Sequence, residues 1–280
     1  MKLQALTVSV NYPDFLCHVL EENKSIFDKW VIVTDTKDKE TFDLCQKYLS
    51  YGVVCIQTDV FYKNAIFNKF AGMNEGLLKI DNDAWCLFLD SDIVLHEQTR
   101  RILEGLNLNT EFIYGIDRLN CKGIEAWLDF KSRRNLVIEN WMLTNAGFEL
   151  GSRLVHYYGY EGGDGKFKGW NPLGFFQLAH RSSFDYYPDK SEGADHCDLV
   201  FARLWEREKR QFIPEIIGIH LESEFIIKGT NWYGRISEPF DSGQIKIGPL
   251  YLIKLAKRYL LIREKRVKRK IEKWIRRKKS

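Results

Sequence analysis

The feature that most constrains the fold is an alternation, in the first half of the chain, of short apolar segments with segments of helical periodicity. The apolar segments have the length and composition of strands, and they span residues 5–10, 30–34, 53–57 and 85–89. The helical segments between them span residues 15–24, 40–49 and 68–80. Strands that are apolar on both faces are typical of a parallel sheet covered by helices on both sides. The pattern therefore predicts an α/β fold with an open, mostly parallel, doubly wound sheet.

The second half of the chain is less regular but contains further elements of both kinds. Residues 172–179 and 213–220 have the pattern of strands, and residues 195–207 that of a helix. From residue 250 onward, apolar residues recur at roughly helical spacing among lysines and arginines. We therefore predict one α/β domain over residues 1–248 and a basic amphipathic helix over residues 249–280.

The net charge of +4 conceals two parts of opposite sign. Residues 249–280 contain 14 lysines and arginines and two glutamates, a local charge of +12. The remaining residues carry 28 basic and 36 acidic side chains, a net charge of −8. The acidic body and the basic tail therefore need separate explanations.

Composition favours a cytoplasmic protein. No apolar run approaches the roughly 20 residues that a membrane-spanning helix needs, and the N-terminus lacks the pattern of a signal peptide. The six cysteines are scattered and form no Cys-x-x-Cys pair, which argues against a zinc site and a disulfide framework. We therefore expect a reducing compartment.

Two carboxylates, Asp90 and Asp92, stand one residue apart directly after the strand predicted at residues 85–89. Both could reach one hard cation, and Mg²⁺ and Mn²⁺ prefer such oxygen ligands, which they usually share with substrate phosphates. An alternative is structural, because Asp92 could cap a helical turn over residues 93–103. In open α/β sheets, ligands collect at the carboxyl ends of the strands. Asn11, Asp35 and Asp90 all fall at such ends.

Several segments have the order and spacing of a known enzyme fold. They span residues 8–12, 30–35, 67–77 and 87–92. In this order they resemble the GT-A glycosyltransferases, especially the family-2-like group, over roughly residues 5–240. They correspond to the first strand and its nucleotide-contacting loop, the second strand, the helix before the metal motif, and the strand that ends in the Asp-x-Asp motif itself.

The resemblance implies a set of residues that bind the sugar donor and its metal. Asn11, Asp35, Asn68, Lys69 and Asp90 would contact the nucleoside diphosphate. Asp90 and Asp92 would hold Mn²⁺ or Mg²⁺, with His220 as the third ligand. A neutral imidazole suits Mn²⁺ better than Mg²⁺. Without that context, a single histidine at the end of a strand is more often structural.

The resemblance also implies a catalytic carboxylate. In inverting members an acidic residue that opens a helix removes the proton from the acceptor hydroxyl. Asp198 matches this place, and Asp195 is the alternative base, because the usual Glu-Asp pair is absent from this sequence. Either aspartate could instead be a helix N-cap.

Three loops near the expected site carry weaker signals. Arg235 could bind a diphosphate with two hydrogen bonds and Trp232 could stack on a base or a sugar, or both could belong to a surface turn. Residues 159–165 form a glycine-rich loop without the ending of a Walker motif, and we place it near the acceptor site. Residues 174–177 could line the sugar pocket or belong to the core.

Together these features predict a metal-dependent hexosyltransferase that moves a sugar from a nucleoside-diphosphate sugar to a hydroxyl group, with inversion. A surface glycan or a lipid-linked saccharide is the favoured acceptor, and a hydroxymethylated base in DNA is the alternative. A nucleotidyltransferase would need a glycine-rich phosphate loop after the first strand, which the sequence lacks. A non-catalytic nucleic-acid-binding protein would leave Asp90, Asp92, Asp198 and His220 without a role.

The basic tail predicts a contact with an anionic membrane surface. Its apolar residues, Leu252, Leu255, Leu260, Ile262, Val267, Ile271 and Trp274, recur at roughly helical spacing. This pattern favours a protein that is peripheral on the inner face of the membrane. Two alternatives are binding to DNA through phosphate neutralisation and a solvated helix that packs only Leu252 and Leu255 on the body.

Overall fold

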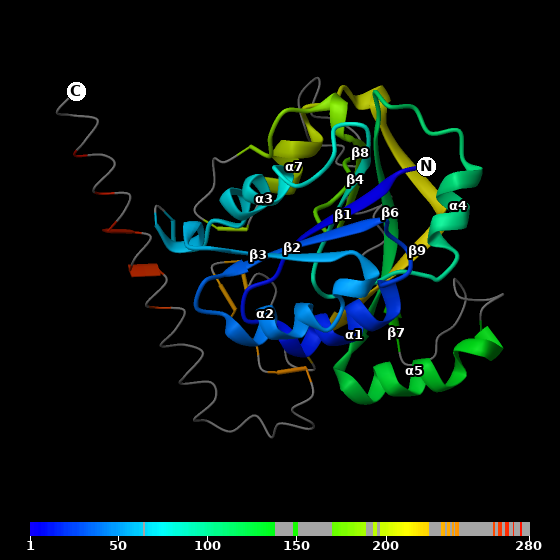
Figure 1. The fold of residues 1–280 in the computed structure, drawn as a ribbon, viewed down its shortest axis with the longest axis horizontal. Coiled ribbons are helices and arrows are strands. Elements are labelled where there is room, and N and C mark those ends of the chain that lie inside the picture. The colour runs from blue at the N-terminus through cyan, green and yellow to red at the C-terminus, as the bar shows by residue number, and fades with distance from the viewer. Residues whose placement is uncertain are drawn as a thin grey trace.

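The computed structural model describes residues 1–63, 65–137, 148–150, 170–188, 193–194, 197–223, 231–232, 234–235, 237, 239–240, 260, 263–264, 267–268, 271 and 275. In these residues a twisted nine-stranded sheet forms the centre of the molecule, with helices on both of its faces (Figure 1). The predicted boundary between a domain ending at residue 248 and a tail lies outside the described residues and stays a prediction.

The strands, in chain order, are β1 (Leu3–Val8), β2 (Lys29–Asp35), β3 (Val53–Thr58), β4 (Trp85–Leu89), β5 (Ile93–Val94), β6 (Ile113–Lys122), β7 (Phe148–Leu150), β8 (Phe176–His180) and β9 (Arg210–Glu222). Their order in the sheet is β3-β2-β1-β4-β8-β6-β9-β5, and β7 pairs with β6. The pairs among β1 to β4 are parallel, whereas β8 is antiparallel to both of its neighbours. The prediction of a mostly parallel sheet is therefore correct for the first half of the chain only, and the whole sheet is mixed.

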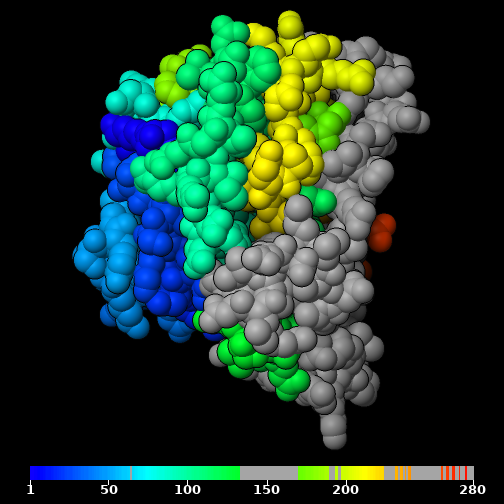
Figure 2. Space-filling view, turned by 90° about the vertical axis from the view of Figure 1, so that its right-hand side faces the viewer, coloured from blue at the N-terminus to red at the C-terminus, as the bar shows by residue number. Residues whose placement is uncertain are grey.

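The helices are α1 (Pro13–Asn23), α2 (Lys39–Gln46), α3 (Lys69–Leu77), α4 (Thr99–Gly105), α5 (Gly123–Val137) and α7 (Cys197–Ala202). Short 3-10 helices occur at η1 (Leu49–Tyr51), η2 (Val60–Tyr62), η5 (Arg181–Ser183) and η6 (Arg207–Lys209). Helices α1 and α2 cover one face of the sheet, and α3 and α7 cover the other (Figure 1). Near the β9 end of the sheet, α4 packs beside β9 on the surface (Figure 2). No helix of the described residues has the length and apolarity needed to cross a membrane.

The directions of the strands place most strand ends on one side of the sheet. Strands β4 and β6 both run antiparallel to β8, so they run in the same direction as each other. Strand β9 is parallel to β6. The carboxyl ends of β1, β2, β3, β4, β6 and β9 therefore lie along one side, which we term the carboxyl edge. The opposite side is termed the amino edge.

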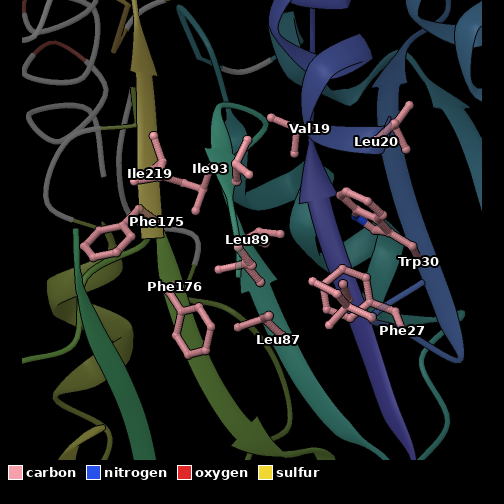
Figure 3. Packing of buried hydrophobic residues seen from close by; sticks show 14 of the residues in the cluster. Val19, Leu20, Phe27, Trp30, Leu87, Leu89, Ile93, Phe175, Phe176 and Ile219 are labelled. Carbon is pink, nitrogen blue, oxygen red and sulfur yellow. The ribbon is translucent and has the colours of Figure 1, made fainter. Parts of the chain in front are cut away.

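The core forms two apolar layers because the strands are apolar on both faces. Leu87 and Leu89 of β4 point to the face covered by α1, where they lie in one cluster with Val19 and Leu20 (Figure 3). Phe88 points to the other face, into an aromatic cluster with residues of α3 and α7. A shift of one residue in the register of β4 would turn each set of side chains into the layer packed around the other set. The position of the residues that follow β4 is thereby fixed.

Close packing of α3 brings its N-terminus to the carboxyl edge. A Cβ atom at Gly72 would collide with the ring of Phe61, and one at Gly76 would collide with Leu6 of β1. The two glycines let the helix lie directly on the sheet. Asn68 caps the helix by accepting a hydrogen bond from the backbone N–H of Ala71 at 3.0 Å. Lys69, the next residue, begins the helix at the end of the sheet where the strands terminate.

The structure contradicts one structural alternative of the sequence. Residues 93–103 do not form a helix capped by Asp92. Ile93 and Val94 instead form β5, which pairs antiparallel with β9. The pairing explains the difference, because β9 offers a strand partner that a local pattern cannot reveal.

Candidate functional site

The carboxyl edge gathers the chemically active side chains, because strands from distant parts of the chain end there. Asp90 directly follows β4, and its backbone N–H donates to the carbonyl of Phe175 at 3.2 Å. The chain then turns into β5, whose Ile93 lies opposite His220 of β9. The backbone N–H of Leu221 donates to the carbonyl of Asp92 at 2.8 Å. This pairing sets Asp92 beside His220.

His220 lies between two carboxylates. Its Nε2 is 3.4 Å from Oδ2 of Asp92, and its Nδ1 is 3.1 Å from Oε1 of Glu222 and 3.3 Å from Oδ1 of Asn120. Burial and the charge of Arg118 lower the pKa of His220, but Asp92 and Glu222 outweigh them, so its pKa is raised. Burial raises the pKa of each of these two carboxyls, but His220 outweighs it, and both end below their usual values. The ring is held in one orientation with Nε2 towards Asp92.

Asp90 is paired with a partly buried cation. The ammonium of Lys69 forms an ion pair with Oδ1 of Asp90, and the two side chains are 18% and 29% exposed. Burial alone would lower the pKa of Lys69, but the charge of Asp90 outweighs it and raises that pKa. Burial raises the pKa of Asp90, although Lys69 opposes the change. An ammonium has three N–H donors, so a pair with one carboxylate oxygen leaves it able to bind further anionic oxygens.

The second carboxylate of the motif has an unused oxygen. Oδ1 of Asp92 is buried and accepts no hydrogen bond in the described structure. A buried acceptor without a partner is costly and needs an explanation. Around it, the carboxylates of Asp90, Asp92 and Glu222 outnumber the permanently charged cations of Lys69 and Arg118. A ligand that brings positive charge would correct both features.

A divalent cation fits this site if substrate phosphates and water complete its ligand shell. Within the described residues, no three His, Cys, Asp or Glu side chains are already gathered where a metal ion could sit. Mg²⁺-type sites commonly use only one or two carboxylates and complete their shell with substrate phosphates and water. Oδ1 of Asp92 is such a ligand, and Nε2 of His220 lies beside the same carboxylate. Glu222 supports this assignment, because metal-binding histidines usually donate their other ring N–H to a carboxylate.

Asp198 belongs to the same region but is held by the backbone. The N–H of Gly174 donates to its Oδ2 at 3.0 Å, and the N–H of Leu199 donates to its Oδ1 at 2.8 Å. A Cβ atom at Gly174 would lie 2.9 Å from the Cβ of Asp198, so the glycine permits the approach. Asp198 is close enough to act electrostatically on the pKa values of Lys69 and Asp90. Asp195, the alternative base, lies outside the described residues.

The loop after β1 has a preset backbone. Asn11 has φ of 61°, the left-handed region that few non-glycine residues adopt. Its N–H donates to Oδ2 of Asp38 at 2.5 Å, and the same oxygen accepts from the hydroxyl of Thr34 at 2.9 Å. Asp35 ends β2 with its carboxylate turned to the N–H of Lys37, at 2.9 Å. Strain of this kind clusters at ligand-binding sites, although binding of a nucleotide by Asn11 and Asp35 stays a prediction.

Arg235 attaches the chain beyond β9 to the loop after β1. It forms a bidentate ion pair with Asp14, with Nη2 2.6 Å from Oδ2, and also donates to the carbonyl of Asn11 at 2.6 Å. Its guanidinium lies 4.6 Å from the centre of the Tyr12 ring. The expected role of Arg235 in binding a diphosphate stays a prediction. In the structure, Arg235 acts as a clamp that fixes the loop after β1 through Asn11 and Asp14.

The four-residue segment at 174–177 belongs to the core. Phe175, Phe176 and Gln177 are almost completely buried, and β8 lies inside the sheet. Gln177 donates to the carbonyls of Pro172 and Asp198 and accepts from the hydroxyl of Tyr187. These side chains therefore do not line a sugar pocket. The glycine-rich loop predicted near the acceptor, residues 159–165, lies outside the described residues.

Sequence reasoning missed Arg118, Asn120 and Glu222. The first two lie on β6, in register with Gly218 and His220 of β9. Their strand was not predicted, so nothing pointed to their position. Glu222 could have been found, because it follows His220 by two residues on one strand and so shares its face.

Comparisons with known proteins give a fold likeness and no family. No family model matches the chain, and no curated protein matches its sequence. One solved structure, described as a mycobacterial protein, is 15% identical with a TM-score of 0.38 over 79% of this chain and 65% of its own. This chain thus spans slightly less than two thirds of that protein.

Two further structures are glycosyltransferases by name. Glucosyl-3-phosphoglycerate synthase from Mycobacterium tuberculosis, in complex with phosphoglyceric acid, is 12% identical with a TM-score of 0.38 over 78% of this chain and 71% of its own. Mouse xyloside xylosyltransferase 1 is 12% identical with a TM-score of 0.31 over 65% and 68%. TM-scores below 0.5 are too low for these likenesses to support a function.

Proposed function

We propose that the protein is a metal-dependent glycosyltransferase that moves a sugar from a nucleoside-diphosphate sugar to a hydroxyl group. One observation carries the proposal: the buried, unpartnered Oδ1 of Asp92 lies among an excess of carboxylates, next to the ion pair of Lys69 and Asp90. A site with unsatisfied negative charge and a neighbouring ammonium suits a cation together with the phosphates that accompany it.

Asp92, His220 and Asp90 would hold the divalent cation. When bound, Mn²⁺ or Mg²⁺ neutralises the charge that develops on a departing diphosphate. Glu222 accepts a hydrogen bond from Nδ1 of His220 and so keeps the ring turned with Nε2 towards the site. Lys69 is placed to donate its remaining N–H groups to phosphate oxygens while Asp90 holds its position.

The nucleoside side of the donor would be bound at the ends of β1 and β2 and at the start of α3. Asn11, Asp35 and Asn68 supply carbonyl, carboxylate and amide groups there. The clamp of Arg235 on Asp14 holds the loop that carries Asn11. Because the loop is fixed before the donor arrives, less conformational entropy is lost on binding.

Asp198 would act as the general base on the acceptor hydroxyl, which makes the reaction an inverting one. Each of its oxygens accepts one backbone N–H, and each keeps a lone pair for a further hydrogen bond. The backbone contacts fix the carboxylate without consuming its capacity to accept a proton. Asp195 is the alternative base.

We propose a surface glycan or a lipid-linked saccharide as the acceptor. A hydroxymethylated DNA base is the alternative, and a screen of acceptors distinguishes the two.

The test is a donor screen on the purified full chain. Release of UDP and GDP from a panel of sugar donors is measured after EDTA treatment, with and without added Mn²⁺. We expect release with one donor class, restored by Mn²⁺ and reduced at least about 100-fold in Asp92→Ala. Asp83→Ala is the matched control, because Asp83 precedes β4 at the amino edge and is 76% exposed.

The control should keep the activity of the wild type. Full activity of Asp92→Ala in EDTA-treated buffer would show that the metal assignment is wrong. The absence of release from every donor and acceptor pair would overturn the transferase assignment itself.

A further inference from the structure

Seven residues of the C-terminal segment are described, and all seven are helical and exposed. Leu260, Val267, Ile271 and Ile275 are helical and 60%, 50%, 52% and 41% exposed. In Figure 1 the described residues of this segment, in red, stand apart from the sheet. Such large aliphatic side chains are rarely left together in water without a partner.

The spacing of these four residues places them on one side of the helix. At 3.6 residues per turn, positions 260, 267, 271 and 275 fall within an arc of about 80°. We term this set the apolar stripe. The segment around the apolar stripe is basic in sequence, with 14 lysines and arginines among residues 249–280. Glu264 is an acidic residue on the apolar side.

The charge pattern determines what can cover the apolar stripe. Residues 249–280 carry a net charge of +12, and the rest of the chain carries −8. A second copy of the segment would bring the same +12 and be repelled. A nucleic-acid backbone would match the charge but would leave the apolar stripe in water. An anionic bilayer offers both an apolar layer and negative headgroups at one surface.

We propose that the C-terminal segment that carries the apolar stripe binds to the headgroup layer of an anionic membrane, with the apolar stripe directed into the acyl chains. Each Lys or Arg close to an anionic leaflet strengthens binding by about fivefold. The acidic body is repelled by the same surface, so the segment alone holds the protein there. This inference does not depend on the proposed transferase activity.

The test is co-sedimentation of the full chain with vesicles of phosphatidylcholine alone, or of phosphatidylcholine and phosphatidylserine in equal parts. The full chain should bind the anionic vesicles at least about tenfold more strongly than the neutral ones. Val267→Ser/Ile271→Ser/Ile275→Ser keeps the charge and should weaken binding by at least about tenfold. Lys265→Gln/Arg269→Gln/Lys273→Gln keeps the apolar stripe and should also weaken it at least about tenfold.

The matched control removes three exposed aliphatic side chains from the body. Leu49, Leu78 and Leu128 are 55%, 78% and 55% exposed, and their joint replacement by Ser should leave vesicle binding unchanged. The apolar-stripe variant and the control should keep the unfolding midpoint of the body, because the side chains that they change are exposed. Equal vesicle binding by the apolar-stripe variant would overturn the inference. So would stronger binding of the full chain to duplex DNA than to anionic vesicles, or a dimer that the apolar-stripe variant converts to a monomer without losing vesicle binding.

Discussion

The two edges of the sheet use charged residues in opposite ways. At the amino edge, Lys2 and Lys29 share Asp81, Lys2 also contacts Asp83, and the side chains are 30–76% exposed. At the carboxyl edge, the side chains of the two charge pairs, Lys69 with Asp90 and His220 with Asp92, are 14–29% exposed. The amino edge contains matched, solvated pairs, whereas the carboxyl edge contains partly buried charges, with the carboxylates of Asp90, Asp92 and Glu222 around the cations of Lys69 and Arg118 and the ring of His220.

We infer from this difference that the charges of the amino edge support the fold, whereas those of the carboxyl edge are suited to binding a ligand. Exposed pairs contribute little, typically about 0.2–1 kcal/mol each, and can be removed at low cost. Buried, unbalanced charges destabilise a protein unless something else binds them. Such an arrangement is expected where binding or catalysis requires it. The comparison therefore predicts that substitutions at the two edges differ in both kind and size of effect.

The largest expected effect is on transfer in Asp198→Asn. The amide keeps the shape of the side chain but removes the base, so the transfer rate should fall by about 10²–10⁴-fold while donor binding stays near normal. Single-turnover kinetics and donor titration measure the two quantities. Asp28→Asn, at the amino edge, should leave the rate within about twofold. Loss in Asp195→Asn but not in Asp198→Asn would move the base to Asp195.

The next largest effect is on stability in Lys69→Met. Removing the ammonium leaves the partly buried Asp90 without its cation, which should cost about 1.5–3 kcal/mol of unfolding free energy. Lys29→Met removes a half-exposed partner of Asp81 and should cost less than about 1 kcal/mol. Urea unfolding of both variants checks the difference. Equal losses of unfolding free energy in Lys69→Met and Lys29→Met would contradict the proposed difference between the two edges.

A third effect concerns stabilisation by ligand. Because a ligand that binds only the folded state stabilises it, Mn²⁺ with UDP at about 100 times the dissociation constant should add about 2.7 kcal/mol. His220→Ala should raise the Mn²⁺ concentration needed for that stabilisation, since it removes a ligand from the site. Thermal unfolding across a Mn²⁺ titration measures the shift. If the Mn²⁺ titration is the same in His220→Ala and the wild type, His220 has a structural role and is not a metal ligand.

The smallest effect is a pH dependence at the amino edge. Hydrogen bonds from Lys2, Lys29 and Gln4 hold the pKa of Asp81 well below its ordinary value of 3.8. A carboxyl whose pKa is lowered by folding stabilises the fold above its unfolded pKa, and this contribution is lost as the pH falls through the folded pKa. Asp81→Asn should therefore cost less than about 1 kcal/mol at neutral pH, because Asp81 is 37% exposed.

The difference in unfolding free energy between Asp81→Asn and the wild type should become smaller only below about pH 4. Urea unfolding of the variant and the wild type over the acid range measures it. A deficit that stayed constant through acid pH would mean that Asp81 acts through packing and not through its charge.

The first half of the fold could be predicted from the sequence because its strands are uninterrupted apolar segments. Strand β4 was predicted with its observed ends, and Asp90 was therefore placed correctly at the end of a strand. Strand β6 was missed because polar residues interrupt it, among them Asp117, Arg118 and Asn120. Its apolar pattern is incomplete because Arg118 and Asn120, near its end, lie on the side of the site, whereas Leu119 and Cys121 between and after them are in the core.

The site could be predicted only as a set of residues at strand ends. The carboxylates of Asp90 and Asp92 were expected to share one cation, but the structure pairs them with Lys69 and His220. These pairings depend on the placement of α3 and β9, which the local pattern does not contain. The unpartnered oxygen of Asp92 is likewise a property of packing.

The order of the strands also has a consequence for a chain that is still being synthesised. Strands β1 to β4 and α3 come first, and the pair of Lys69 and Asp90 forms within them. Asp198, His220 and Glu222 arrive only with α7 and β9. Since a domain generally folds as a unit, the pair of Lys69 and Asp90 becomes enclosed only when β8 has joined β4 and the later strands have completed the sheet. A chain interrupted before α7 would lack Asp198, His220 and Glu222, and would leave Lys69 and Asp90 without these neighbours.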